Sequence, residues 1–153
     1  MRYVISRKKN RPINPNVKKI LTEEKKLNLD DIESCLVFKK KCENSKSKLK
    51  NLLSKLKLSG KKIVGYAATS KSTTILNYCK IGPQIIDYIC DTTPEKIGKY
   101  SPGMHIPIVS TDRFRNDNPD IAYLFAWNHK NEILKKEKFF KKNNLKWISH
   151  VEI

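Results

Sequence analysis

Apolar side chains recur at helical spacing through the first 60 residues, with polar turns between them. Residues 16–25 are predicted to form a short helix capped by Asn16, and Asp30 or Asp31 is placed to cap a longer helix that Gly60 ends. Lysines fill the positions between the apolar residues of the long helix and predict a solvated face. Residues 2–6 have the composition of a short strand.

From Lys61 onward the pattern changes to short apolar runs that alternate with helical segments. Helices are expected to begin at Thr73 and to cover 129–142, and strands to cover 62–66, 85–90, 106–109, 121–126 and 146–151. Such alternation implies right-handed crossovers, so we expect an α/β fold with a mostly parallel sheet flanked by helices, preceded by a strand and a long helix. Parallel sheets bind ligands beyond the carboxyl ends of their strands, which here means the loops at 67–72, 91–105 and 127–128.

The segment after the first of these later strands nearly matches a phosphate-binding loop. From Gly65 it fits GxxxxGK[ST], except that Ser70 replaces the glycine that lets backbone amides curl around phosphates. An NTPase is therefore disfavoured. What remains is a helix N-terminus that suits a diphosphate, with Lys71 as a point charge and hydroxyls from Thr69, Ser70, Ser72 and Thr73. Hydroxyl capping of the helix alone is the alternative.

The next loop carries further candidate binding residues. Asp91 ends the second of these strands, where an acid could hold a ribose hydroxyl or simply start the loop; GxGxxG is absent, so an NAD site is not predicted. Residues 91–107 hold three prolines and two glycines, an irregular backbone typical of functional loops. Its possible donors and stacking surfaces are Lys96, Tyr100 and His105.

Trp127 and Asn128 follow the fourth of these strands. The Trp127 ring could stack on a ligand, and the Asn128 amide could bind one, although capping a helix that begins at His129 is its favoured role. A lone histidine is usually structural, so without a partner Ser, Cys or metal cluster no histidine is assigned a catalytic role.

Charge and cysteine content narrow the classes of function. The formal charge of +17 suggests nucleic-acid binding, but 19 of the 32 Lys and Arg lie in residues 1–62 and only 5 are Arg, which favours solvated lysines on the long helix. Four cysteines with no CxxC pair indicate free, buried thiols in a reducing compartment and no metal site. No apolar run approaches the ~18 residues of a membrane span and no signal segment is evident, so we expect a cytoplasmic protein without a membrane partner.

Three segments together resemble the C-terminal domain of S-adenosylmethionine-dependent sugar C-methyltransferases. They are GYAATSKSTTILNYC from Gly65, residues 91–107 with PGMHIP, and FAWN from Phe125; the opening MRYV and Arg11-Pro12 also match, so the resemblance covers essentially the whole chain. In that family a zinc-binding segment and a methyltransferase domain precede a Rossmann-like domain that helps hold a nucleotide sugar. The resemblance implies that residues 1–28 are an edge strand and linker helix from the preceding domain, and that 29–153 form the Rossmann-like substrate-binding domain.

The resemblance also implies site residues. The loop from Thr69 to Thr73, together with Asn77, would face the diphosphate or nucleotide, and the substrate cleft would be shaped by Tyr100, Pro102, Gly103 and His105. The family's glycine-rich adenosylmethionine loop, zinc cysteine cluster and catalytic His-Glu pair have no counterpart in the sequence. Adenosylmethionine would therefore bind outside these residues, and Met1 would be internal to a longer or split enzyme.

These observations lead to one hypothesis and two alternatives. We expect the nucleotide-sugar-binding portion of a C-methyltransferase, inactive alone and completed by a methyltransferase domain in cis or in trans. In the intact enzyme, as the resemblance implies, a base would remove a proton beside a keto group of the sugar, and the enolate would attack the methyl group of adenosylmethionine. The alternatives are a stand-alone basic nucleotide- or RNA-binding module, with nucleic acid the less favoured partner, and a degenerate phosphate-loop NTPase.

Overall fold

The computed structural model describes residues 3–7, 9–138 and 145–152 and divides the chain into two compact units, Met1–Cys42 and Glu43–Ile153. The boundary falls within α2 (Ile32–Leu58). The boundary predicted between residues 28 and 29 remains a prediction. Among the described residues, no helix is long and apolar enough to cross a bilayer.

The first unit contains α1 (Pro15–Lys26) and the beginning of α2. Pro15 opens α1, and the Asn14 side chain accepts a hydrogen bond from the Asn16 amide, so Asn14 is the cap and the prediction that Asn16 caps this helix was wrong. The predicted strand at 2–6 is also wrong for Tyr3–Ser6, while Arg2 lies outside the described residues. A strand needs a neighbour to pair its amides and carbonyls, and the described chain offers these residues none.

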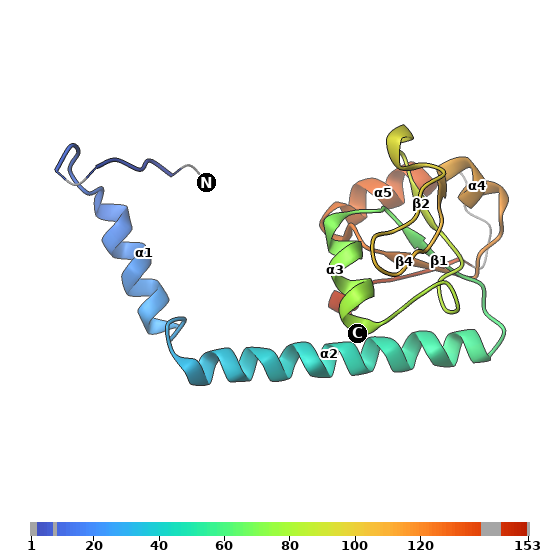
Figure 1. Ribbon diagram of the computed structural model, residues 1–153, viewed down its shortest axis with the longest axis horizontal. Helices are drawn as coiled ribbons and strands as arrows, with labels where there is room; N and C mark the ends of the chain where they lie inside the picture. The colour runs from blue at the N-terminus through green and yellow to red at the C-terminus, as the bar shows by residue number, and fades with distance from the viewer. Residues whose placement is uncertain (1–2, 8, 139–144, 153) are drawn as a thin grey trace. The chain divides into compact units, whose positions relative to one another are not determined.

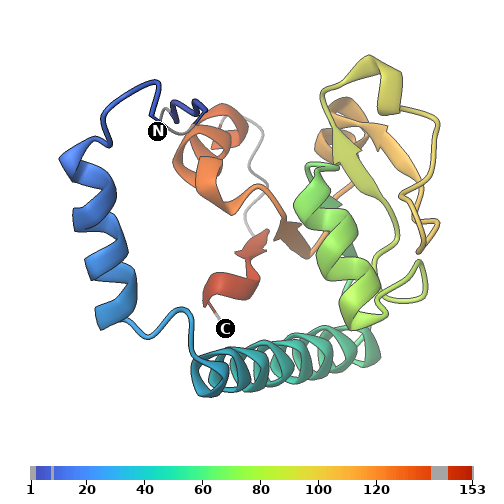
Figure 2. The same cartoon turned by 60° about the vertical axis from the view of Figure 1, so that its left-hand side comes forward.

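The second unit is built on a five-stranded sheet whose neighbouring strands are all parallel, which confirms the expected α/β, Rossmann-like fold. The strand order is β3-β2-β1-β4-β5, so the chain starts in the centre of the sheet and crosses to each side in turn, as in a doubly wound sheet. Figures 1 and 2 show the ribbon, with β1, β2 and β4 labelled in Figure 1. The strands are β1 (Ile63–Tyr66), β2 (Ile89–Asp91), β3 (Ile108–Ser110), β4 (Ile121–Leu124) and β5 (Lys146–Ile148).

Helices connect these strands, with boundaries that differ in places from the prediction. The helix expected from Thr73 begins earlier, at Ser70, because Thr69 caps it. The helix expected over 129–142 ends at Glu137, with 139–144 outside the described residues. The elements are α3 (Ser70–Cys79), α4 (Thr111–Asn116), α5 (Lys130–Glu137) and the 3-10 helices η1 (Pro94–Lys96), η2 (Trp127–His129) and η4 (His150–Glu152).

Each of the five strands is shorter than predicted, and the runs 85–90 and 146–151 lose the most. The run 85–90 contributes only its end to β2, because the amides of Ile85 and Ile86 bond to the Gly82 carbonyl in a turn. The run 146–151 ends at Ile148, since the following residues turn into η4. The five strands expected after Lys61 are nevertheless present, in the predicted order along the chain.

Both faces of the sheet are covered. Successive residues of β1 alternate between two buried clusters: Ile63 packs with Leu49 and Leu53 of α2, whereas Val64 packs with Phe114 of α4. Burial on both faces explains why β1 and β4 carry no charged residue and are buried along their whole length. Gly65 in β1 is needed for close packing, since a Cβ there would lie 2.7 Å from the Phe125 ring.

The four cysteines are free thiols, but the prediction that they are buried is wrong for Cys35, which is exposed, and for Cys42, which is half-buried, because both lie in the first unit, where no described side chain is buried. Cys79 and Cys90 are buried in the second unit, and burial raises the pKa of the Cys79 thiol. Among the described residues no group of three or more His, Cys, Asp or Glu could hold a metal ion.

Candidate functional site

The three loops singled out by the sequence are joined to one another at the carboxyl edge of the sheet. The Ala68 amide donates to the Asp91 carboxylate at 2.7 Å, which links the loop after β1 to the loop after β2. The Lys71 ammonium donates to the Asn128 side-chain oxygen at 3.2 Å, which links α3 to the loop after β4. The loops that strand direction predicts at one edge of the sheet are therefore connected there by hydrogen bonds.

The turn between β1 and α3 is held by a reciprocal cap. The Ser72 amide donates to the Thr69 hydroxyl oxygen at 3.2 Å, and the Thr69 amide donates to the Ser72 hydroxyl oxygen at 3.0 Å. Ser72 is buried, so its hydroxyl serves the turn itself. Ser70 and Lys71 are exposed in the first turn, where their backbone amides have no acceptor within the helix. Thr73, the fourth residue of the helix, is half-buried.

The Asp91 carboxylate connects the loops at this edge of the sheet. Its buried carboxylate accepts from the amides of Ala68 and Thr93, at 2.7 and 2.8 Å, and lies 3.5 Å from the Lys96 ammonium. Burial opposes its ionisation, but these hydrogen bonds and the Lys96 charge outweigh burial and lower the pKa of Asp91. Lys96 also donates to the Ala68 carbonyl at 2.8 Å. Asp91 and Lys96 therefore have a structural role, because their contacts hold two loops together.

The long loop between β2 and β3 is anchored to α3 through Asn77. The Asn77 side chain donates to the Pro102 carbonyl at 2.9 Å and to the Thr73 carbonyl at 2.8 Å. Gly103, with φ +79°, lies so close that a Cβ there would be 2.0 Å from the Asn77 side-chain oxygen. Tyr100 and His105 are exposed on this loop, His105 with φ 52°. The loop is held in one conformation beside α3.

The loop after β4 corrects one expectation. Asn128 does not cap α5: the cap position is His129, which makes no side-chain hydrogen bond there, and the Asn128 oxygen instead accepts from Lys71. Trp127 lies in η2 with 39% of its surface exposed. An exposed indole beside an ammonium group is available to a ligand.

A pocket of about 260 Å³ lies at this edge and includes a residue that the motifs did not single out. It is lined by Ser70, Lys71, Thr74, Ile75, Trp127 and His150. His150 begins η4, directly beyond β5, so the rule that parallel strands end at one edge could have identified it. Burial lowers the pKa of His150. The pocket does not include Tyr100, Pro102, Gly103 or His105.

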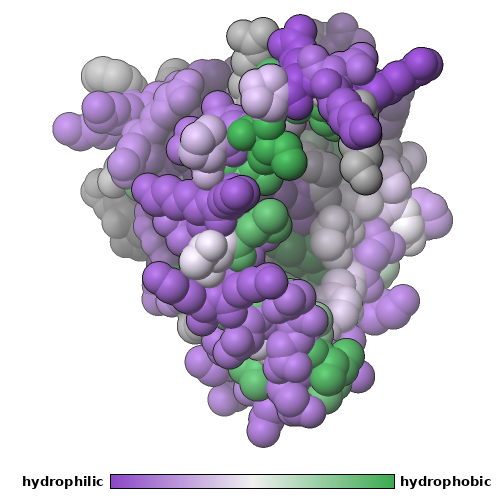
Figure 3. Space-filling view, turned by 90° about the vertical axis from the view of Figure 1, so that its left-hand side faces the viewer, coloured by the Kyte–Doolittle hydropathy of each residue, from purple (hydrophilic) through white to green (hydrophobic). Residues whose placement is uncertain are grey.

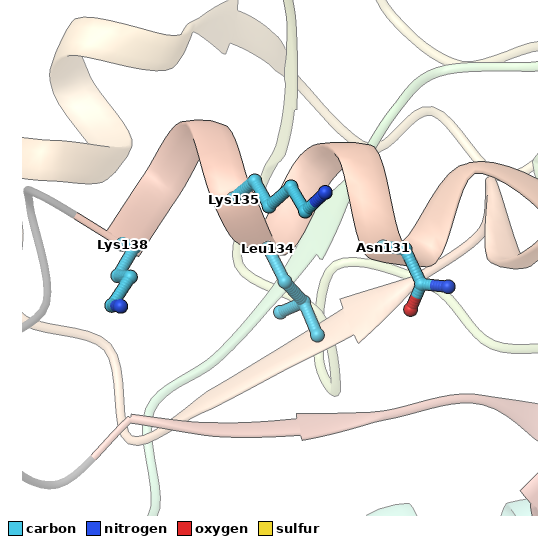
Figure 4. A pocket seen from close by; sticks show the side chains of 4 residues that line it. All are labelled: Asn131, Leu134, Lys135 and Lys138. Carbon is cyan, nitrogen blue, oxygen red and sulfur yellow. The ribbon is translucent and has the colours of Figure 1, made fainter.

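Two further grooves lie along the neighbouring helix. One, of about 340 Å³, is lined by Asn131, Leu134 and Lys135 of α5 and by Lys138 directly after it, as labelled in Figure 4. The other, of about 400 Å³, runs from Trp127 to Glu132. Only the second shares residues with the predicted site, through Trp127 and Asn128.

Comparison with known proteins gives two findings. A family model described as the C-methyltransferase C-terminal domain matches residues 1–151. The C-methyltransferase NovU of Streptomyces niveus is 32% identical over 136 residues, which cover 89% of this chain and 32% of that protein. The chain therefore spans about a third of the length of this relative.

Proposed function

Because the chain belongs to the family of C-methyltransferase C-terminal domains, we propose that it holds the nucleotide-linked keto-deoxysugar on which a C-methyltransferase acts. In this proposal the diphosphate lies against the first turn of α3, and the catalytic and adenosylmethionine sites lie in a methyltransferase domain in cis or in trans. A cytoplasmic location, where four free cysteines stay reduced, belongs to the same proposal.

The observation that carries the proposal is the position of Lys71. Its ammonium lies at the edge where three loops meet, beside the exposed amides of the first helical turn. A helix N-terminus and a lysine both favour an anion, and a lysine binds phosphate as a point charge. The bonds from Asp91 and Asn77 hold the surrounding loops in place before a ligand arrives, which lowers the entropy cost of binding.

The same edge does not fit adenosylmethionine. The sulfonium of that cofactor is a cation, and the Lys71 charge and the positive end of α3 disfavour it. Asp91, the acid best placed to hold its ribose, already accepts from Ala68 and Thr93. When bound elsewhere in the intact enzyme, the cofactor would supply an electrophilic methyl group; residues of this chain would hold and orient the sugar that accepts it.

A titration tests this division of labour. The chain is expected to bind a thymidine diphosphate sugar and not adenosylmethionine. Lys71→Gln should weaken the sugar nucleotide about tenfold, the loss of one charge-assisted hydrogen bond. Lys80→Gln is the matched control, because Lys80 is exposed at the opposite end of the same helix. Calorimetry showing binding of adenosylmethionine but no response to the sugar nucleotide would refute the proposal.

The partner domain is proposed to cover the first unit. This unit has no buried side chain among its described residues, and it contains 13 of the 19 large apolar residues that are exposed in the described chain. Figure 3 shows green hydrophobic side chains at the surface among purple hydrophilic ones. The family match includes this unit, and two thirds of the relative lie outside the matched part. A methyltransferase domain is thus the partner best suited to cover it.

A further inference from the structure

The pocket shared by Trp127 and His150 has features that the diphosphate site does not require. At about 260 Å³ it falls just below the ~300–1,000 Å³ of pockets that take a whole small ligand. It therefore suits one part of a larger molecule. The Trp127 indole and Ile75 supply an apolar wall, and the rings of Trp127 and His150 meet edge to face with centroids 6.4 Å apart.

We propose that this pocket binds a six-membered, oxygen-bearing ring of the sugar nucleotide, with His150 as an uncharged hydrogen-bond donor to an oxygen of that ring; the inference rests on the proposed function. The ring is either the pyrimidine base or the sugar, since both carry such oxygens next to a phosphate. Lys71, which lines the same pocket, would bind the attached phosphate.

The donor role of His150 follows from its contact with Tyr123. The Tyr123 hydroxyl lies 3.2 Å from Nδ1 of His150, and Tyr123 is buried. Burial raises the pKa of Tyr123, so the hydroxyl keeps its proton. Nδ1 is the acceptor within reach of that proton, because a buried hydroxyl that donated to nothing would lose a hydrogen bond. The neutral imidazole then carries its own proton on Nε2.

His150 lines the pocket, and its Nδ1 is engaged by the Tyr123 hydroxyl, so Nε2 is the ring nitrogen left to meet a ligand. Nδ1 is turned toward Tyr123, which is buried, and η4 is tied to the start of α5 by an ion pair between Lys130 and Glu152. The other polar side chains of the pocket are Ser70, Lys71 and Thr74, and the Thr74 hydroxyl donates to the Ser70 carbonyl. Because that bond uses the Thr74 proton, the side-chain donors left for a ligand are those of Ser70, Lys71 and His150, which together with the indole complement acceptor oxygens on a ring.

The tautomer can be measured without any ligand. Two-bond ¹H–¹⁵N correlation spectra of the chain are expected to show His150 with Nδ1 unprotonated and Nε2 protonated. Tyr123→Phe should abolish this preference by removing the only side-chain contact to Nδ1 in the described chain. A wild-type spectrum with the proton on Nδ1 would overturn the donor role, whatever the chain binds.

Binding measurements then test the subsite. The probes are inorganic pyrophosphate, thymidine diphosphate and a hexose 1-phosphate. His150→Phe should weaken one ring-bearing probe about fivefold, the loss of a neutral hydrogen bond, and leave pyrophosphate unchanged; His150→Gln, which keeps an N–H donor, should restore most of the affinity. The probe that responds identifies the ring.

The outcomes separate this inference from the proposed function. If the wild type binds pyrophosphate and the ring-bearing probes respond to Lys71→Gln but not to His150→Phe, the ring subsite is wrong while the diphosphate site stands. Equal weakening of all three probes by His150→Phe would show a structural role and overturn the inference. No binding of any probe would refute the proposed function, and the ring subsite would fall with it.

Discussion

Asn77 and Gly103 show how one contact holds the β2–β3 loop in place. A left-handed backbone at Gly103 brings the loop against the Asn77 amide, which bonds to the neighbouring Pro102 carbonyl. The family resemblance implied that both residues belong to the site, but it could not reveal this contact, because residues 77 and 103 are brought together only by the fold. The contact suggests that Asn77 and Gly103 shape the substrate cleft by fixing the loop.

We predict that Gly103→Ala lowers the free energy of unfolding by about 2–4 kcal/mol, because it combines left-handed strain with a clash against Asn77. Gly98→Ala is the matched control: Gly98 has φ +81° but nothing within 4 Å of the added Cβ, so only the strain of about 1 kcal/mol applies. Urea denaturation of the two variants compares them directly. Equal losses would mean that the loop moves away from Asn77 at little cost.

At the same scale, the sequence identified polar residues at the sheet edge better than it identified their roles. Hydroxyls at Thr69 and Ser72 suggested either a ligand or a cap, and the cap is formed. Asn128 was expected to cap a helix and instead meets Lys71, 57 positions away. His150 was passed over because its neighbours in sequence carry no motif. Local patterns contain no information about such distant contacts.

At the scale of elements, the prediction of strands was most accurate for apolar runs that are buried on both faces of the sheet. β1 and β4 match that description and were found nearly at their predicted bounds. Residues 3–6 are equally apolar but have no neighbouring strand, and they form none. A strand therefore depends on a neighbouring strand as much as on its own residues, because its backbone N–H and C=O groups need partners there. In a helix these groups bond to one another within the same segment.

The helix α2 offers a test of how much burial matters within one element. Leu53 is fully buried against the sheet, whereas Leu36 is 50% exposed. We predict that Leu53→Ala lowers the free energy of unfolding by about 2–5 kcal/mol through lost burial and a cavity, while Leu36→Ala changes it by less than about 0.5 kcal/mol. Chemical denaturation monitored by circular dichroism measures both. A comparable loss for Leu36→Ala would show that this part of α2 is packed in solution.

At the scale of the whole molecule, the charge of +17 loses much of its weight as evidence for nucleic-acid binding. Lysines of α2 such as Lys48 and Lys55 are exposed on the helix that also buries Leu49 and Leu53, so they solvate one face of an amphipathic element. Others make ion pairs, as Lys57 does with Asp87. The chain belongs to the family of C-methyltransferase C-terminal domains, and this membership explains its fold without reference to nucleic-acid binding.

The exposed apolar residues of the first unit provide the last prediction. Val17, Ile20 and Leu21 share one face of α1 and are 45%, 41% and 52% exposed. We expect the chain to bind the two thirds of the Streptomyces niveus C-methyltransferase that it does not match. Val17→Gln/Leu21→Gln should weaken that complex at least tenfold, because polar side chains would be buried at the interface.

Light scattering coupled to size-exclusion chromatography measures the complex. The control is Lys18→Gln/Lys25→Gln, which changes the same helix to the same residue but leaves the apolar face intact and should preserve binding. A chain that forms dimers alone, and loses them with Val17→Gln/Leu21→Gln, would mean that a second copy covers this face. Since apolar burial stabilises the contact regardless of sequence order, the complex should form whether the methyltransferase domain is joined in cis or supplied in trans.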